Sequence, residues 1–482
     1  MKVGNSFFII CILLIIVVLN YELGNSGGIP FCTNCLINIG VAIIVYLFNQ
    51  QITEYKGWWI RPSNIVLLGL FAVNLQYIMD LVLGLKTYED FTSPKTANIC
   101  CAIGTIGILS YIAGNIAFNK RGVERRLKTY NHTNPTNPAC SFLYFMQAAT
   151  FVGWILSVDF FALVTGLTYA DQAWEGGLSE TFEQLFYNST FTILIVKILG
   201  GLHGSKLRMI DFIKAFNVSF WLFVCLYLII RLLSGDRGPF IYLIFALFYT
   251  YIFITHKKIP LRRVLLVGLL FSSLIIIVGM ARSTAYNSTF SDRTSEAMRS
   301  FGKARFSDAT VFVPTEELAY SFRCNEMAVN EINSGAPYHY GMYQIYALLN
   351  CIPFVPSYLY NTLKIPIKEL SSDYYLTEAY FGDYYISGQI GTSIIAEFYL
   401  ELGLLGVIIG MFIVGVLFKT TDSNICLNLS SGLSLIVVIL TILYSSHAIY
   451  LPRSNFLSQM KPIVVIVIMF YLNKYISFKR RV

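Results

Sequence analysis

The sequence predicts an all-α polytopic membrane protein with about twelve transmembrane helices and one large loop outside the membrane. Hydrophobic residues make up 56% of its 482 residues, and charged residues make up 13%, whereas soluble domains carry about 25%. The apolar residues fall into runs of about 20, the length that crosses a bilayer as a helix. Residues 282–391 are the one long hydrophilic stretch. We therefore expect membrane helices before and after a large loop.

Each expected span is an apolar run bounded by polar or charged residues. The spans are 5–22, 31–49, 64–84, 97–118, 141–167, 187–202, 215–234, 239–255, 264–281, 392–418, 431–450 and 460–477. They place nine helices in residues 1–281, the loop in 282–391 and three helices in 392–482. The first run has no small-residue cleavage site after it, which favours a retained helix over a signal peptide.

Basic residues alternate from side to side along this map. The densest runs, KRGVERRLK (120–128) and HKKIPLRR (256–263), lie in loops that share a side with the C-terminal FKRRV. The positive-inside rule makes that side cytoplasmic, with both termini there and the 282–391 loop outside. The net charge of +8 sits mostly in these short loops, so it predicts topology rather than nucleic-acid binding.

Arginines and tyrosines crowd the large loop. Cations suit phosphate, and aromatic faces suit sugar rings. The basic residues in the first part of this loop can instead be explained by ion pairs with acidic residues of the same loop. The residues that we select as ligand contacts are Arg282, Arg293, Arg299, Arg305, Tyr338, Tyr340, Tyr374 and Tyr384.

The turn SGDRGP (234–239) joins two spans without room for an ordinary loop. It places Asp236 and Arg237 at the outer membrane interface. Arg282 lies at the same interface, because it follows the ninth span directly. An arginine there can face a phosphate at the bilayer surface, or it can pair with the aspartate and anchor to lipid headgroups.

The string GQIGTSIIAEFYLELGLLG (388–406) enters the tenth span. Its small residues, among them Thr392 and Ser393, allow a ligand or another backbone to come close. Glu397 falls about one turn into the apolar run, with Glu401 on the same helix face. A carboxylate buried there is costly, so it acts either as a general acid or base or as the partner of an arginine.

Further titratable residues flank the late spans. SSHAIYLPRSNF (445–456) carries Arg453 near the outer interface, and PYHYG carries His339. Histidine suits proton transfer near neutral pH, although a lone histidine is more often structural. The tripeptide DYY occurs at 373–375 and 383–385 without an assigned role. The sequence has no P-loop and no His/Cys cluster with metal-ligand spacing, so no metal or other cofactor is expected.

The chain resembles the Wzy family of O-antigen repeat-unit polymerases. The G-x-R type turn SGDRGP, the late loop segment FVPSYLYNTLKIP and the stretch IGTSIIAEFYLELGLLGV carry the resemblance, and the hydropathy plan matches over nearly the whole length. Related O-antigen ligases often have a His-Asn type pair where this chain has Thr392 and Ser393, which favours a polymerase.

The resemblance implies a GT-C-like glycosyltransferase of the bacterial inner membrane. It would join undecaprenyl-pyrophosphate-linked repeat units at the periplasmic face, releasing undecaprenyl pyrophosphate without a nucleotide sugar or an obligatory metal. Arginines would then stabilise the leaving pyrophosphate. We assign this role first to Arg237 and Arg282, and then to Arg293, Arg299 and Arg453. The candidates for base or orienting roles are Asp236, Glu397, Glu378 and His339.

Two other functions fit the same features. A flippase for the lipid-linked repeat unit also has about twelve helices, but no two-half repeat is visible here. A ligase shares the architecture. The sequence does not name the sugar or the linkage, and it leaves open whether a polysaccharide chain-length regulator binds.

Overall fold

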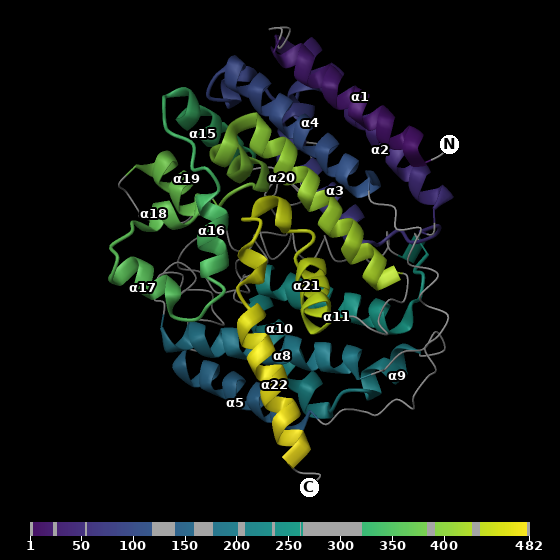
Figure 1. Ribbon diagram of the computed structural model, residues 1–482, viewed down its shortest axis with the longest axis vertical. Coiled ribbons are helices and arrows are strands. Elements are labelled where there is room, and N and C mark those ends of the chain that lie inside the picture. The colour runs from purple at the N-terminus through teal and green to yellow at the C-terminus, as the bar shows by residue number, and fades with distance from the viewer. Residues whose placement is uncertain are drawn as a thin grey trace, which may run out of the picture. The chain divides into compact units, whose positions relative to one another are not determined.

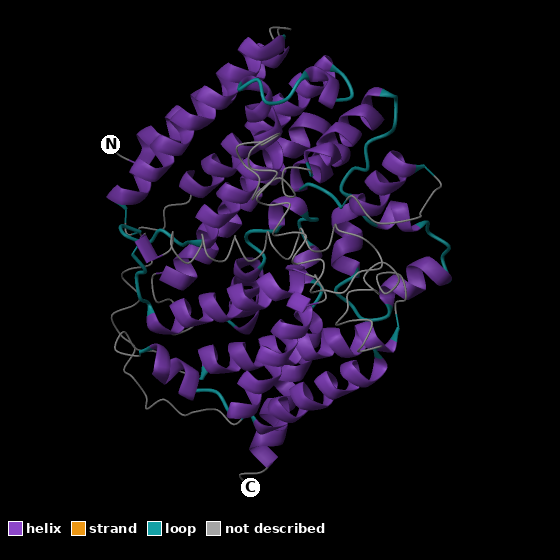
Figure 2. Cartoon of the chain, turned by 180° about the vertical axis from the view of Figure 1, so that it is seen from behind, coloured by secondary structure: helices purple, strands orange, loops and turns teal. Residues whose placement is uncertain are grey.

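The structure is a computed structural model of the whole chain, and its described part is helical with no strand (Figures 1 and 2). The described residues are 3–22, 27–53, 55–117, 140–158, 177–200, 208–233, 237–260, 262–263, 321–382, 391–426 and 434–479. The chain divides into two compact units: residues 1–128, 310–423 and 447–461 form unit 1, and residues 129–309, 424–446 and 462–482 form unit 2.

Unit 1 holds the first four membrane helices, the loop helices and most of α20. Its elements are α1 (Val3–Glu22), α2 (Gly28–Ile52), α3 (Pro62–Val82), η1 (Tyr88–Asp90), α4 (Pro94–Ala117), α15 (Phe322–Asn333), α16 (Met342–Leu349), α17 (Val355–Asn361), α18 (Ile367–Leu370), α19 (Ser372–Phe381), α20 (Ile394–Cys426), η4 (Leu451–Arg453) and η5 (Ser458–Met460). Pro62 and Pro94 begin α3 and α4, since proline at the first helical position loses no intrahelical hydrogen bond.

Unit 2 is built mostly of apolar helices. They are α5 (Ser141–Ser157), α8 (Leu178–Leu199), α9 (Met209–Lys214), α10 (Val218–Leu233), α11 (Arg237–Thr255), α21 (Leu435–Ser446) and α22 (Ile463–Lys479). Helix α8 packs against α5, α11 and α22. Glu183 of α8 also accepts hydrogen bonds from the Tyr227 hydroxyl and the Arg231 Nε of α10, both at 2.7 Å.

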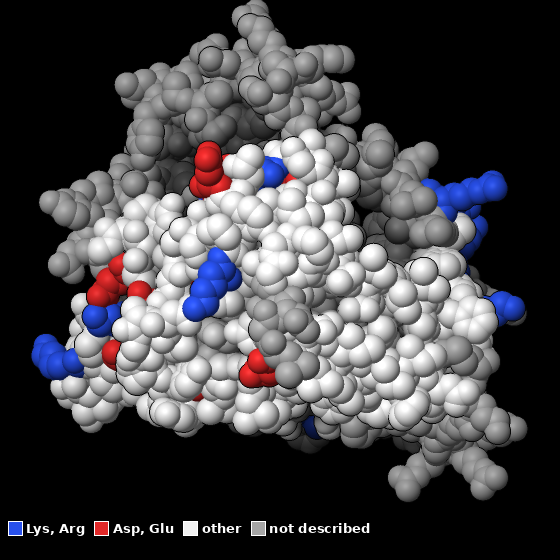
Figure 3. Space-filling model, turned by 90° about the horizontal axis from the view of Figure 1, so that it is seen from above, with Lys and Arg blue, Asp and Glu red and all other residues white. Residues whose placement is uncertain are grey.

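The predicted class, a polytopic helical membrane protein, is confirmed. Seven helices among the described residues are long and apolar enough to cross a membrane, and three shorter apolar helices cover 141–157, 218–232 and 435–446. Charged side chains are sparse on the described surface of the face in Figure 3. The expected span 264–281 lies outside the described residues, so the total of about twelve and the three-part division of the chain stay predictions.

Helix α4 is the centre of unit 1, because the apolar window that would span the membrane is wholly buried. Two glycines bring α20 against it. A Cβ on Gly114 would collide with the carbonyl of Phe412, and a Cβ on Gly415 would collide with the carbonyl of Tyr111. These close approaches fix the long helix that carries the buried carboxylates described below.

Helix α20 bends at Leu402 and Gly403, where the backbone leaves helical geometry. Gly403 has φ +60°, and an added Cβ would lie 2.8 Å from the Tyr338 hydroxyl, so both conformation and space require glycine. Helices α15 to α19 lie beside the first part of α20 (Figures 1 and 2). Helix α15 is the first of these helices in the chain.

Candidate functional site

Glu397 lies in the first turn of α20, with 1% of its surface exposed. One carboxylate oxygen accepts hydrogen bonds from the Gln344 Nε2 of α16 and from the Phe456 backbone N–H at 3.2 Å. The other accepts one from the Ser372 hydroxyl of α19 at 3.0 Å. Three neutral donors therefore hold Glu397, and both of its carboxylate oxygens accept hydrogen bonds. No cation among the described residues forms an ion pair with it.

Polar groups continue from Glu397 through the start of α19. The hydroxyls of Ser372 and Thr392 lie 3.1 Å apart. The amide of Asn455 donates to the Ser371 hydroxyl at 2.7 Å and to Asp373 at 3.5 Å. Asp373 is half-buried, whereas Ser372 is fully buried. The cluster thus runs from a covered carboxylate to a second carboxylate that solvent reaches.

A buried amide pair joins this region to α3 and α15. The Asn74 side-chain oxygen accepts hydrogen bonds from the Asn325 amide at 2.9 Å and from the Ser393 hydroxyl at 3.2 Å. All three side chains are fully buried. Because unpaired amides are costly inside a protein, this junction fixes the position of the α20 start against the other helices.

Glu401, one turn after Glu397, caps α16. Its carboxylate accepts the backbone N–H groups of Gly341 and of Tyr343, the latter at 3.0 Å. The acidic side chain also complements the positive end of the helix dipole. Glu397 and Glu401 therefore both bind α16, one at its side and one at its N-terminus.

His339 lies beside this cap. Its Nε2 is 3.0 Å from the Tyr343 hydroxyl, and the Tyr375 ring packs edge-on against it. Burial lowers the pKa of His339, with the charge of Glu369 opposing the effect, so the imidazole is neutral at pH 7. Burial raises the pKa of Tyr343 and of Tyr375. Tyr375 in turn donates to Glu331 of α15 at 3.0 Å.

Arg453 ends η4 and is half-buried. Burial raises the pKa of the Cys324 thiol to about 12, while the charge of Arg453 lowers it and that of Asp373 raises it. Arg453 lies two residues before Asn455, whose amide contacts Ser371 and Asp373, so its backbone lies near the start of α19.

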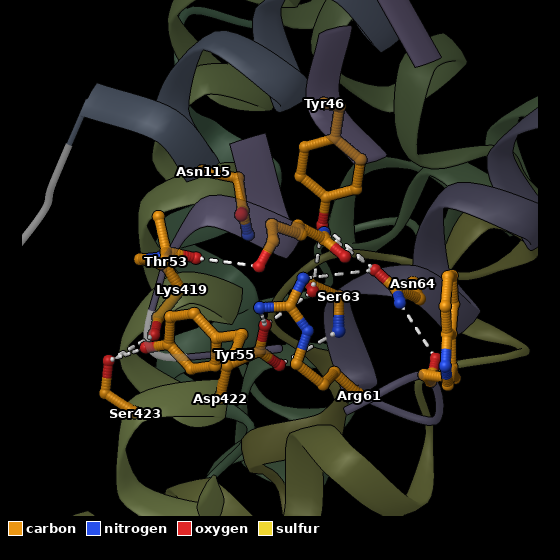
Figure 4. Close-up of polar contacts among 12 residues, drawn as sticks. Tyr46, Thr53, Tyr55, Arg61, Ser63, Asn64, Asn115, Lys419, Asp422 and Ser423 are labelled. Carbon is orange, nitrogen blue, oxygen red and sulfur yellow. Dashed lines mark hydrogen bonds and ion pairs between the residues drawn. The ribbon is translucent and has the colours of Figure 1, made fainter. Parts of the chain in front are cut away.

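A second buried carboxylate, Asp422, lies toward the other end of α20, and its polar contacts are drawn in Figure 4. It pairs with Arg61 at 3.6 Å, and both side chains are wholly buried. Asp422 also accepts from the Ser63 hydroxyl at 2.5 Å and from the Ser63 N–H at 3.2 Å. The Tyr55 ring lies under the Arg61 guanidinium at 4.4 Å and under the Lys419 ammonium at 4.1 Å. This second cluster is thus cationic and aromatic, unlike the first.

The structure brings Glu397, Thr392 and Ser393 into one network and places His339 and Arg453 beside it. Tyr338 lies at the kink, Tyr340 is 70% exposed and Tyr374 is half-buried. Glu378 is held by Lys368 at 2.6 Å. Arg237 begins α11, in unit 2, and its side chain is not described. The predicted residues outside the described ranges are Asp236, Arg282, Arg293, Arg299, Arg305 and Tyr384.

The sequence did not reveal the neutral side chains that donate hydrogen bonds within this cluster. Ser372, Gln344 and Asn455 are ordinary polar residues, separated from Glu397 by 25, 53 and 58 positions. Two of them lie beside segments that the sequence did mark: Ser372 precedes the first DYY, and Asn455 follows Arg453. No such signal marked Gln344. Among the described residues, no group of three or more His, Cys, Asp or Glu could hold a metal ion.

The fold and this polar interior define a polytopic helical membrane protein with a candidate site around a buried carboxylate. The family model of the O-antigen polysaccharide polymerase Wzy matches residues 5–480, nearly the whole chain. The protein therefore belongs to the Wzy family, whose members polymerise lipid-linked O-antigen repeat units in membranes. No curated protein and no solved structure matches the chain significantly.

Proposed function

We propose that this protein is a glycosyltransferase that joins undecaprenyl-pyrophosphate-linked repeat units at the outer face of the inner membrane. A hydroxyl oxygen of one lipid-linked unit attacks the anomeric carbon of the growing glycan. The bond from that carbon to the pyrophosphate oxygen breaks, and undecaprenyl pyrophosphate leaves with the electron pair. The hydroxyl proton passes to a protein base. The donor is already activated, so the chemistry calls for a base and for cationic stabilisation of the leaving group.

The observation that carries the proposal is the environment of Glu397. Three neutral donors hold it, and no described cation pairs with it, so its negative charge is available to a substrate proton. A sugar hydroxyl is the same kind of donor as the Ser372 hydroxyl. An acceptor sugar can therefore replace Ser372 at the carboxylate without the loss of a hydrogen bond. In this proposal Glu397 is the general base, and Gln344 and the Phe456 N–H orient it.

Arg453 is the described cation that we assign to the pyrophosphate. It is half-buried and lies two residues before Asn455, which contacts Asp373, and a guanidinium can bind phosphate oxygens through two N–H groups at once. Arg237 and Arg282 remain the further candidates from the sequence. GT-C-like architecture, metal independence and cytoplasmic termini are parts of the same proposal, supported by the basic loops and by the family.

The test uses purified full-length protein in lipid nanodiscs, with the cognate lipid-linked repeat unit and no nucleotide sugar. Wild type is expected to give a ladder of multimers on a gel. Glu397→Gln keeps the shape and the oxygen acceptor but removes the base, so we expect turnover to fall by about 10²–10⁴-fold. Glu89→Gln, at an exposed carboxylate of η1, is the matched control and keeps the ladder.

Arg453→Lys, Arg237→Ala and Arg282→Ala complete the set. Loss of the ladder in any of them, with binding of the lipid-linked unit retained, assigns that arginine to the leaving group. A ladder that survives Glu397→Gln refutes Glu397 as the base while leaving polymerisation intact. Absence of a ladder from folded wild type with its cognate substrate points to a flippase or a ligase instead.

A further inference from the structure

Helix α16 has two faces of opposite character. One face is bound to α20, because Tyr343 is buried there and Gln344 donates to Glu397. The other face carries Met342, Ile345 and Leu348, which are all exposed. Their spacing of three residues aligns them along one side of the helix. The exposed side of α16 is therefore a continuous apolar stripe.

The apolar surface continues beyond α16 into the turn before α17. Ile352 is exposed, and Phe354 is 86% exposed. Phe354 also has φ +71°, the left-handed region that a bulky residue rarely adopts. A large aromatic side chain is thus held outward, on a strained backbone, with no protein around it among the described residues. We call residues 342–364 the α16–α17 hairpin.

The chain enters α16 beside the point where the exposed apolar side of α20 begins. The segment leading into α16 is hydrogen-bonded to the α20 kink, from His339 N–H to the Leu400 carbonyl and from Tyr340 N–H to the Glu401 carbonyl, both at 3.0 Å. The exposed apolar residues of α20 begin at the next position, and they are Leu402, Leu405, Ile409 and Ile413. Since α20 is long and apolar enough to span the membrane, this side of α20 faces acyl chains.

The far end of the hairpin has the composition of a membrane–water interface. Tyr358 and Tyr360 are exposed on α17, and Lys364 is exposed directly after Leu363. Tyrosine is enriched where acyl chains meet headgroups, and lysine extends its ammonium toward them. The order along the hairpin is therefore aliphatic and phenylalanine first, then tyrosine and lysine.

We propose that the α16–α17 hairpin is embedded in the bilayer leaflet at the Ile394 end of α20, with Ile345, Leu348 and Phe354 among phospholipid acyl chains. Tyr358, Tyr360 and Lys364 lie at the headgroups. The hairpin is tied to Glu397 through Gln344 and to Glu401 through the helix cap. Immersion of the hairpin thus holds the Glu397 cluster at the depth of lipid headgroups. This inference concerns membrane contact and stands apart from the proposed reaction.

Photocrosslinking in lipid tests this. The full-length protein carries p-benzoylphenylalanine in place of Ile345 or Phe354, or in place of Asn333, an exposed polar residue at the end of α15. The protein is irradiated in nanodiscs of phosphatidylethanolamine and phosphatidylglycerol, and in native membranes, and adducts are identified by mass spectrometry. We expect phospholipid adducts at 345 and 354 at several-fold higher yield than at 333.

Equal yields at all three positions overturn the proposal, as does a polyprenyl or protein adduct as the main product from native membranes. Phe354→Trp gives a second measurement if a photolabelled variant does not fold. Brominated acyl chains are expected to quench the added tryptophan fluorescence, measured as the difference from wild type. If aqueous iodide quenches this fluorescence and brominated lipid does not, residue 354 faces water and the proposal is wrong.

Discussion

Two carboxylates on α20 are buried to the same degree but are held in opposite ways. Asp422 pairs with Arg61 and is bound by Ser63, in a cluster with Tyr55 and Lys419 (Figure 4). Glu397 is bound by Gln344, Ser372 and a backbone N–H, with no described cation in an ion pair. Both arrangements satisfy a buried charge with hydrogen bonds. Only the arrangement around Asp422 also neutralises the charge, through Arg61.

This difference decides whether a buried carboxylate can readily take up a proton. A carboxylate neutralised by a buried arginine cannot take a proton without leaving the arginine unpaired, which is costly. A carboxylate held by neutral donors can change its protonation state, because its neighbours carry no charge that depends on it. Asp422 therefore contributes to the stability of unit 1, and the surroundings of Glu397 agree with the role of general base that we propose for it.

The largest expected effect is on stability at the Asp422 end. Asp422→Asn leaves Arg61 buried without its counter-charge, and we expect it to lower the free energy of unfolding by about 3–5 kcal/mol. Glu397→Gln orphans no cation and is expected to change stability much less. Thermal unfolding in detergent, followed by intrinsic fluorescence, compares the two.

The double variant Arg61→Met with Asp422→Leu is the control for that comparison. It removes both charges and keeps similar volume, so it should recover most of the loss. If the single and double variants are equally unstable, packing rather than charge pairing holds this end of α20.

The kink between the two carboxylates gives the next effect. Gly403→Ala meets a left-handed φ and the Tyr338 hydroxyl, and we expect a cost of about 1–3 kcal/mol for the backbone, with the contact in addition. Gly382 has nearly the same backbone conformation, with φ 64° and ψ −150° against 60° and −143° for Gly403, and nothing lies near an added Cβ there. Gly382→Ala therefore measures the backbone cost alone, and Tyr338→Phe in the Gly403→Ala background should recover part of the contact cost. Equal losses at both glycines would show that the contact adds nothing.

Acid is expected to weaken the Glu397 region through His339. Burial lowers the folded-state pKa of His339 below its ordinary value of about 6.5. As the pH falls through 6.5, the unfolded chain therefore binds a proton that the folded chain does not, and stability decreases. Above that pH the contribution of this group is constant.

Thermal midpoints of wild type and His339→Gln, taken at about pH 7.5 and about pH 5.5, isolate this contribution. Buried Glu326, whose pKa is raised by burial, acts in the opposite direction but is common to both proteins. A wild type that loses no more stability in acid than the variant would refute the assignment.

The smallest effect is expected at Lys368 and Glu378. Their ion pair at 2.6 Å is partly exposed, at 39% and 28% of the two side chains, so solvent screens it. Lys368→Met should change stability by less than about 1 kcal/mol. Glu378→Gln in the polymerisation assay then separates a catalytic role from this surface pair: an unchanged ladder removes Glu378 from the candidate bases.

The sequence by itself determined the class of the protein and marked one residue of the proposed site. A long apolar run must satisfy its backbone groups within a helix to cross a bilayer, so hydropathy alone predicts the membrane helices. A glutamate inside such a run is rare enough to be noticed, and this singled out Glu397. The family resemblance came from short strings of the same kind, and the comparison with the family confirmed it.

The tertiary structure alone decided what surrounds that glutamate. Gln344, Ser372 and the Phe456 N–H come from three separate segments, and amides and hydroxyls are common on any loop. Likewise, the sequence did not show that Asp422 is neutralised by an arginine and that Glu397 is not. The partner of Asp422 is Arg61, which lies far away in the chain, in the connection between α2 and α3. Local patterns specify which segments are helices. Which donors and cations meet a buried carboxylate depends on how those helices pack, and that determines whether its charge is structural or reactive.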